Sequence, residues 1–381
     1  MRQNTLERSA HALNVAFACS WWRPRIPTWS FTPYSLRAAL IDAGVTVRDV
    51  DAQPPLYVQA PLAAALTVLS RGPWKYARPY RALQDYRVRH AVSSLRPDAV
   101  IEIADLVVPT CAPTYSYQDS CFAVALEHYE TFGREMVSTV PTTREQLRRL
   151  ADDQHQRLSR LEGVLAMGQW FRDYLVNRGI LPAERIHAVG AGISPQFRSH
   201  PPRVPRSREQ RLRLLFVGGE FRRKGGDWVL EAVARLNQQG DRRLTLTIVG
   251  PAEWPMKKPP PDWVDFRGAL PRDQVRELFQ EHDLFVMPSR FEAYGIAFRE
   301  ARAAGLPCVG RDAFAMPELI EPGVGGAVWR TNDVNDLAGL ILACLDDDSL
   351  HERCARAMSS IADEASWTRV AENILDRMAV A

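Results

Sequence analysis

The stretch LLFVGGEFRRKGGDWVL, residues 214–230, has the order of an apolar strand, a glycine turn, a basic loop, a second glycine pair and the start of a helix. The turn is Gly218-Gly219, and Arg223 and Lys224 lie between the two glycine pairs. Two cations in a glycine-flanked loop after a strand suit a diphosphate, because they offset its charge while the backbone approaches it closely. The spacing matches neither GxxxxGK[ST] nor GxGxxG. A solvated basic turn is the alternative, and this stretch alone leaves it open.

Strand and helix patterns alternate on both sides of this stretch. Strands are expected at Asn14–Ser20, Val45–Val50, Asp98–Ala104, Leu212–Val217, Leu244–Val249, Val264–Arg267, Leu284–Pro288 and Pro307–Val309, and helices at Tyr34–Ala43 and Asp227–Gln239. Such alternation predicts parallel sheets covered by helices on both faces. A proline-rich charged segment, SHPPRVPRSREQR at 199–211, separates the two series and is typical of a linker.

We therefore predict an α/β protein with two doubly wound, Rossmann-like domains facing each other across a cleft. The expected bounds are 1–200 for the N-terminal domain, 201–210 for the linker and 211–364 for the C-terminal domain.

The composition agrees with a soluble globular protein. The chain has 381 residues, of which 46% are hydrophobic and 24% charged, enough for two or three domains. A net charge of +3 gives no reason to expect a nucleic-acid partner. The six cysteines form no CxxC pair or metal-ligand spacing, and the first thirteen residues are polar, unlike a signal peptide. These features predict reduced thiols and a cytoplasmic location.

A second stretch, FEAYGIAFREARAAGLPCV at 291–309, contains two glutamates, Glu292 and Glu300. At about 100° per residue, Glu300 falls in the middle of a face made by small and apolar residues. An unpaired carboxylate there would cost several kcal/mol, so it needs partners. Ribose hydroxyls of a nucleotide would serve, and so would a neighbouring arginine, and both alternatives remain open. Gly295, at the start of this helix, would let backbone N–H groups approach a phosphate.

Together the two stretches resemble the retaining glycosyltransferases of family 4, which have the GT-B fold. The Glu-x7-Glu motif of that family matches Glu292 and Glu300, and its VGR…KG loop matches VGGEFRRKG at 217–225. Further matches are VDFRGALPRDQVRELF at 264–279, MPELIEPGVGGAVW at 316–329 and SWTRVAENIL at 366–375. The resemblance covers about Leu161–Ala381.

The resemblance implies transfer of a sugar, with retention, from a UDP- or GDP-linked donor to a hydroxyl of a glycan, lipid-linked or small-molecule acceptor. It implies no metal and no cofactor apart from the nucleotide sugar as co-substrate, and a C-terminal helix at about 365–381 that packs on the N-terminal domain. The implied catalytic residues are Glu292, Lys224 and Asp119. The implied donor-binding residues are Gly218, Gly219, Arg223, Lys224, Arg267, Tyr294, Gly295, Ile296 and Glu300.

The N-terminal half departs from the family pattern. Trp21, Trp22 and Trp29 lie in SWWRPRIPTWSFTP at 20–33, where a glycine-rich loop is usual. These rings could stack a sugar acceptor or pack at the domain edge, with equal weight. Gln118, a further candidate for the acceptor side, replaces the histidine of a His-Asp pair, which leaves open whether a histidine-assisted mechanism applies. His128 is more typical of a structural residue. A catalytically inactive nucleotide- or glycan-binding module of the same fold is the alternative function.

The segment Arg71–Arg96 has seven Lys/Arg residues and one Asp, interleaved with aromatic residues. It could contact an anionic acceptor or a membrane surface, which would place the protein at the periphery of the inner membrane. A solvated helical face is the interpretation that we favour.

Overall fold

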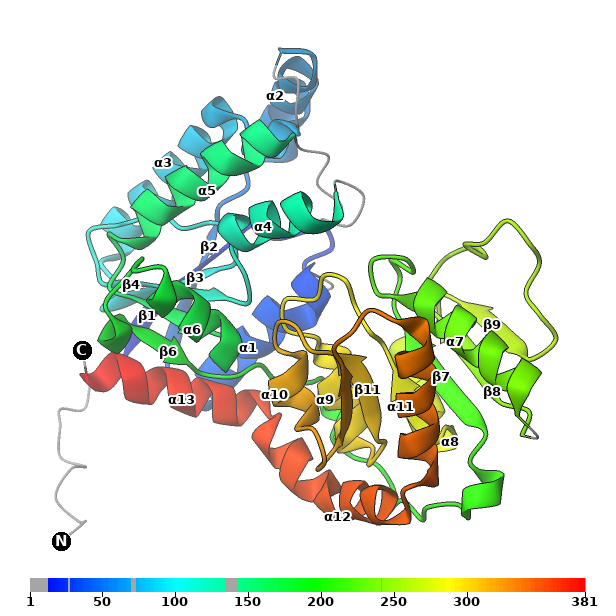
Figure 1. Ribbon diagram of the computed structural model, residues 1–381. Coiled ribbons are helices and arrows are strands. Elements are labelled where there is room, and N and C mark those ends of the chain that lie inside the picture. The colour runs from blue at the N-terminus through cyan, green and yellow to red at the C-terminus, as the bar shows by residue number, and fades with distance from the viewer. Residues whose placement is uncertain (1–12, 27, 70–72, 134–142, 241, 381) are drawn as a thin grey trace, which may run out of the picture.

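The computed structural model describes residues 13–26, 28–69, 73–133, 143–240 and 242–380. Two parallel sheets build two lobes that stand side by side, as Figure 1 shows. The N-lobe is the part built on strands β1–β6, and the C-lobe is the part built on β7–β12.

The N-lobe sheet has the strand order β2-β1-β3-β4-β5-β6. Its strands are β1 (Asn14–Cys19), β2 (Thr46–Asp51), β3 (Ala99–Ile103), β4 (Thr114–Gln118), β5 (Gly163–Ala166) and β6 (Ile186–Ala188). Its helices are α1 (Thr32–Asp42), α2 (Leu56–Leu69), α3 (Arg78–Leu95), α4 (Phe122–Phe132), α5 (Arg144–Leu158) and α6 (Gln169–Asn177), with short 3-10 turns η1 (Thr28–Phe31) and η2 (Trp74–Tyr76). Strands β3, β4 and β5 are buried along their whole length, as expected for parallel strands covered on both faces.

The C-lobe sheet has the order β12-β11-β10-β7-β8-β9, again with every pair parallel. Its strands are β7 (Arg213–Val217), β8 (Thr245–Val249), β9 (Val264–Gly268), β10 (Leu284–Val286), β11 (Cys308–Arg311) and β12 (Gly326–Trp329). The helices that follow are α7 (Gly226–Gln239), α8 (Arg272–Glu281), α9 (Ile296–Ala303), α10 (Met316–Ile320), α11 (Val334–Asp346), α12 (Asp348–Glu364) and α13 (Trp367–Val380).

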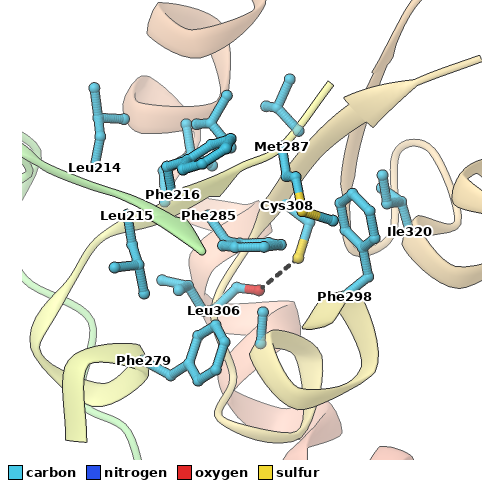
Figure 2. Packing of buried hydrophobic residues seen from close by; sticks show 14 of the residues in the cluster. Leu214, Leu215, Phe216, Phe279, Phe285, Met287, Phe298, Leu306, Cys308 and Ile320 are labelled. Carbon is cyan, nitrogen blue, oxygen red and sulfur yellow. Dashed lines mark hydrogen bonds between the residues drawn. The ribbon is translucent and has the colours of Figure 1, made fainter. Parts of the chain in front are cut away.

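Aromatic packing fixes α9 against the centre of the C-lobe sheet (Figure 2). The ring of Phe298 on α9 meets Phe285 of β10 edge to face at 5.3 Å, and Phe285 meets Phe279 of α8 at 5.7 Å. Cys308 fills the space beside them, and its thiol donates a hydrogen bond to the carbonyl of Leu306. This core sets the position of the loop between β10 and α9.

The strand order of the C-lobe reverses between β7 and β10, which pair side by side through Leu284 and Leu214. Ligands of doubly wound sheets bind beyond the carboxyl ends of the strands at such a switch point. The two loops that leave it are residues 218–225 after β7 and 287–295 after β10.

The last two helices divide between the lobes. Helix α12 packs on α9 in the C-lobe, whereas α13 packs on α1 in the N-lobe, crossing under it in Figure 1. Trp367 and Ile374 of α13 belong to the N-lobe core. A Cβ at Gly192 would lie 2.5 Å from the Trp367 ring, so the chain segment entering the C-lobe passes directly beneath α13.

Most expected elements are present with shifted ends. Strand β10 ends at Val286 instead of Pro288. The amide of Met287 still donates a hydrogen bond to the carbonyl of Val309 in β11, and the chain leaves the sheet after it. Helix α1 begins at Thr32, two residues earlier than expected, because Pro33 is well suited to a first helical turn. The segment 201–210 is tied to the C-lobe through Arg206, whose guanidinium lies 2.7 Å from Asp283.

Within the described residues, no helix is long and apolar enough to cross a membrane.

Candidate functional site

The glycines of the loop after β7 allow it to pack against the loop after β10. A Cβ at Gly218 would lie 2.3 Å from Lys224 Cδ, so the stem of Lys224 lies directly across that glycine. Gly225 has a φ of 78° and would place a Cβ 2.4 Å from the carbonyl oxygen of Pro288. The amide of Arg290 donates to the carbonyl of Arg223 at 2.8 Å. The two loops therefore form one wall at the switch point.

Lys224 and Glu292 form an ion pair across these loops, with Nζ 2.6 Å from Oε2. Both side chains are mostly buried, at 17% and 13% exposure. Arg223 lies 3.9 Å from the same carboxylate and also donates to the carbonyl of Phe291. Burial alone would raise the pKa of Glu292, but Lys224 and Arg223 outweigh burial and hold the pKa below its usual value. Glu292 is therefore ionised, and two cations surround it.

The N-lobe brings a second carboxyl group to this place. Asp119 directly follows β4, and burial together with the charge of Glu292 raises its pKa to about 6. Gln118, just before it, is buried; its Nε2 donates to Ser116 Oγ at 2.5 Å, and its Oε1 is buried without a hydrogen-bond partner among the described residues. Asp119 and Glu292 thus come from opposite lobes and lie near enough for the charge of one to raise the pKa of the other.

Glu300 is buried on α9 and pairs with Arg272 at the start of α8, with Nη2 2.5 Å from Oε1. Burial raises the pKa of Glu300 to about 7, while Arg272 and, more weakly, Lys224 oppose the rise. Its neighbours on the same helix have other partners: Arg299 donates to the hydroxyl of Tyr294, and Arg302 donates to the carbonyls of Leu319 and Ile320.

Arg272 is a site residue that the sequence did not reveal. Its guanidinium lies 4.9 Å from the ring of Phe31 in the N-lobe and 4.8 Å from the ring of Phe197, in the 3-10 turn η5 (Pro195–Phe197) between the lobes. Its Nε is buried without a partner among the described residues. Because the pairing with Glu300 spans 28 residues and the stacking spans both lobes, no local sequence signal could have indicated either contact.

Of the remaining expected donor residues, all but Arg267 belong to these two loops or to the start of α9. Gly295 has a φ of 91° and forms the N-cap of α9, so the first N–H groups of α9, beginning with Ile296, point toward the site. Tyr294 is buried beside them. Gly219 has free space beside it, because the nearest atom to a Cβ added there would be the carbonyl oxygen of Gly250, at 3.7 Å. Arg267, at the end of edge strand β9, is exposed and pairs with Asp265 at 2.7 Å, so it lies farther from the central loops.

The three tryptophans of the N-lobe loop separate into two groups. Trp21 is 2% exposed and packs on Phe17 in the core, which excludes an open acceptor face and corrects the expectation for this residue. Trp22 and Trp29 are 48% and 44% exposed, with their ring centroids 6.4 Å apart. Only these two rings of the three present surface to a ligand.

His128 has a packing role in the structure. Its ring lies 4.6 Å from Phe132 and 5.0 Å from Phe291, so it joins α4 to the loop that carries Glu292. Burial lowers its pKa to about 4, which keeps the ring neutral.

In the basic segment, α3 buries Tyr80 and Arg81 but leaves Tyr86 and Arg89 exposed, while Arg71 lies outside the described residues.

The described part of the chain holds no group of three or more His, Cys, Asp or Glu side chains placed to bind a metal ion.

Comparison with known proteins supports the fold. Residues 211–347 match the family model described as Glycosyl transferases group 1. An alpha-D-kanosaminyltransferase from Streptomyces kanamyceticus is 29% identical over 205 residues, covering 50% of this chain and 53% of that protein. A GDP-mannose-dependent alpha-mannosyltransferase from Corynebacterium glutamicum is 31% identical over 165 residues, covering 43% of this chain and 38% of that protein. The chain therefore spans about half or less of the length of these curated relatives.

Among solved structures, WaaG, a glycosyltransferase involved in lipopolysaccharide biosynthesis, has a TM-score of 0.66 with 19% identity, covering 95% of this chain and 98% of its own. The predicted GT-B architecture of two facing Rossmann-like sheets is confirmed.

Proposed function

We propose that this chain, whose residues 211–347 form a glycosyl transferases group 1 domain, is a retaining glycosyltransferase of family 4. It moves a sugar from a UDP- or GDP-linked donor to a hydroxyl of a glycan, lipid-linked or small-molecule acceptor. The observation that carries the proposal is the Lys224–Glu292 ion pair at the switch point, whose carboxylate also raises the pKa of Asp119 in the other lobe.

In this proposal, the diphosphate of the donor lies between the loop 218–225 and the N-terminus of α9. Lys224 and Arg223 offset its charge, and the N–H groups at Gly295 and Ile296 donate to it, because helix N-termini favour anions. These fixed charges stabilise the leaving diphosphate, so the reaction needs no metal ion. Glu300 accepts hydrogen bonds from the ribose hydroxyls, and Arg267 flanks the base.

Glu292 and Asp119 lie at the reacting end of this arrangement. Glu292, held ionised by Lys224, is placed to stabilise positive charge that develops on the donor sugar. Asp119 has a pKa of about 6, so near neutral pH it is mostly ionised and can accept a proton from an acceptor hydroxyl. Gln118 and the exposed rings of Trp22 and Trp29 form the acceptor side. The enzyme works in the cytoplasm, at the periphery of the inner membrane.

A donor screen tests the proposal directly. The name of the mannosyltransferase relative makes GDP-mannose the first donor to test, followed by other GDP- and UDP-sugars. We expect one donor to raise the melting temperature progressively with the logarithm of its concentration above Kd, and to release its nucleoside diphosphate when an acceptor is present. Lys224→Ala should abolish both effects, whereas Arg235→Ala, which removes a cation from the exposed face of α7, should change neither.

The same screen separates the enzyme from an inactive binding module. A donor that stabilises the protein but is neither transferred nor hydrolysed, with any acceptor hydroxyl tested, would favour the binding module. The absence of stabilisation by every nucleotide sugar would contradict both functions.

A further inference from the structure

Helix α2 lacks the polar outer face of an ordinary surface helix. Its sequence, LYVQAPLAAALTVL, contains no charged residue, and Leu66 is its one buried side chain. Tyr57 is 80% exposed, Val68 83% and Leu69 76%. A surface helix normally buries an apolar stripe and turns polar residues to solvent, so a helix with an apolar outer face needs cover on that face.

The exposed residues form a continuous stripe along α2. Tyr57, Ala60, Pro61, Ala64 and Val68 are all exposed, and their spacing of three or four residues places them on one face. The stripe extends for about 16 Å along the helix axis. Figure 1 shows α2 at the outer end of the N-lobe, beyond α3 and away from the C-lobe. No other element of the described chain covers this face.

The sequence on both sides of α2 carries charges of a single sign. From Ala52 to Gln84 the sequence contains no Asp or Glu. Lys75 of η2, which packs beside α2, and Arg78 at the start of α3 are both exposed and have no ion pair among the described residues. Trp74 lies next to them, 5.8 Å from the ammonium of Lys75. An apolar stripe, an aromatic ring and unpaired cations therefore occur together.

We propose that the stripe Tyr57–Val68 of α2 docks on an anionic lipid bilayer, with α2 lying in the plane of the headgroups and Lys75 and Arg78 contacting lipid phosphates. A helix of 14 residues is about 21 Å long, too short to cross the hydrocarbon core, but sufficient to lie on it. Cations beside an apolar helix add attraction to anionic headgroups.

A second copy of the chain fits this surface less well. Pairing two α2 helices would bring Lys75 and Arg78 of one copy toward those of the other, and no carboxylate between residues 52 and 84 could offset them. Like charges at an interface oppose association. A bilayer with anionic lipids supplies the missing charge.

Co-sedimentation of the full chain with vesicles tests the proposal without any measurement of sugar transfer, so its result is independent of the proposed reaction. We expect binding to phosphatidylcholine vesicles containing about a third phosphatidylglycerol, and weaker binding to phosphatidylcholine alone. Added salt should reduce the difference between the two compositions, because it screens the cations. Lys75→Ala combined with Arg78→Ala should remove that difference and leave the weaker binding.

Val68→Glu should reduce vesicle binding at least tenfold without lowering the melting temperature, since this side chain is exposed. Ala64→Glu, in the middle of the stripe, should do the same. Val204→Glu is the matched control, because Val204 is 85% exposed but lies in the segment between the lobes, and it should bind like the wild type. Full binding by both stripe variants, or no binding of the wild type to either vesicle, would overturn the proposal. A dimer in solution that Val68→Glu dissociates would assign the surface to a second copy instead.

Discussion

We expect the affinity of the protein for its donor to depend on pH, because the pKa of Glu300 lies near neutrality and is set in part by Arg272. If Glu300 accepts hydrogen bonds from the ribose, its ionised form should bind the donor best. Since the pKa of Glu300 is about 7, the carboxylate is mostly ionised at pH 8 and mostly protonated at pH 6. The fraction of ionised Glu300 then falls roughly tenfold over this range, so donor affinity should fall by about the same factor. Glu300→Gln should lower the affinity at pH 8 by roughly ten- to a hundredfold, because hydrogen bonds to charged groups contribute about 1.5–3 kcal/mol.

Arg272→Gln provides the sharper perturbation. The guanidinium lowers the pKa of Glu300, so its removal should move the midpoint of donor binding to higher pH. Affinity should be weakened at pH 7 and should recover at pH 9, where Glu300 ionises even without its partner. Arg276→Gln, one turn farther along α8, is the control, because Arg276 donates to the carbonyl of Ser199 and not to Glu300.

Stability measurements separate this role from a structural one. In the folded chain the pKa of Glu300 lies above its ordinary value of 4.5, so folding favours the neutral form. The contribution of Glu300 to stability is therefore complete below pH 4.5 and decreases as the pH rises toward 7. Glu300→Gln, which stays neutral, should melt no lower than the wild type at pH 8.

Titration calorimetry with the nucleoside diphosphate of the cognate donor, between pH 6 and 9, measures these affinities. An affinity independent of pH in the wild type, or unchanged in Glu300→Gln, would refute the role of Glu300. If Arg272→Gln and Arg276→Gln gave the same profile, the coupling to Arg272 would be wrong.

Three further predictions concern the wall formed by the two loops. Gly218→Ala should weaken diphosphate binding, since the new methyl group would displace the stem of Lys224; a melting temperature that falls while affinity stays intact would contradict this. Glu292→Gln should lower turnover more than nucleotide binding, as steady-state kinetics and calorimetry together can measure; equal losses in both would argue against action in the transition state. Turnover should persist in excess EDTA, and a loss that Mn²⁺ or Mg²⁺ restores would require a metal in the mechanism.

Local patterns in the sequence predicted the elements and the loops that carry the C-lobe site. Apolar runs bounded by glycine and proline located β7 and β10, and the glycine pairs around Lys224 indicated a loop under tight packing. The pairing of β7 with β10 depends on the path of the chain over some seventy residues, and no local pattern encodes it. The same limit applies to Glu300, for which the sequence indicated the need for a partner but could not identify Arg272.

Burial of aromatic and apolar residues was the least predictable property. Trp21 and Trp22 are adjacent in the sequence, yet Trp21 packs on Phe17 in the core and Trp22 lies on the surface, and no sequence pattern in this irregular loop distinguishes them. The sequence of α2 shows that the segment is apolar. Periodicity cannot show, however, which side of such a helix stays exposed after folding.

The N-lobe loop that contains Trp21, Trp22 and Trp29 contacts the C-lobe through Phe31. Phe31, at the end of this loop, has a φ of 69°, an uncommon conformation for a residue with a large side chain. Its ring lies on the guanidinium of Arg272, which in turn holds the carboxylate of Glu300. Because Phe31 belongs to the N-lobe and Arg272 to the C-lobe, any movement that separates the lobes must break this stacking. The environment of Glu300, and with it the charge that the proposed ribose site presents, therefore depends on how the two lobes are placed.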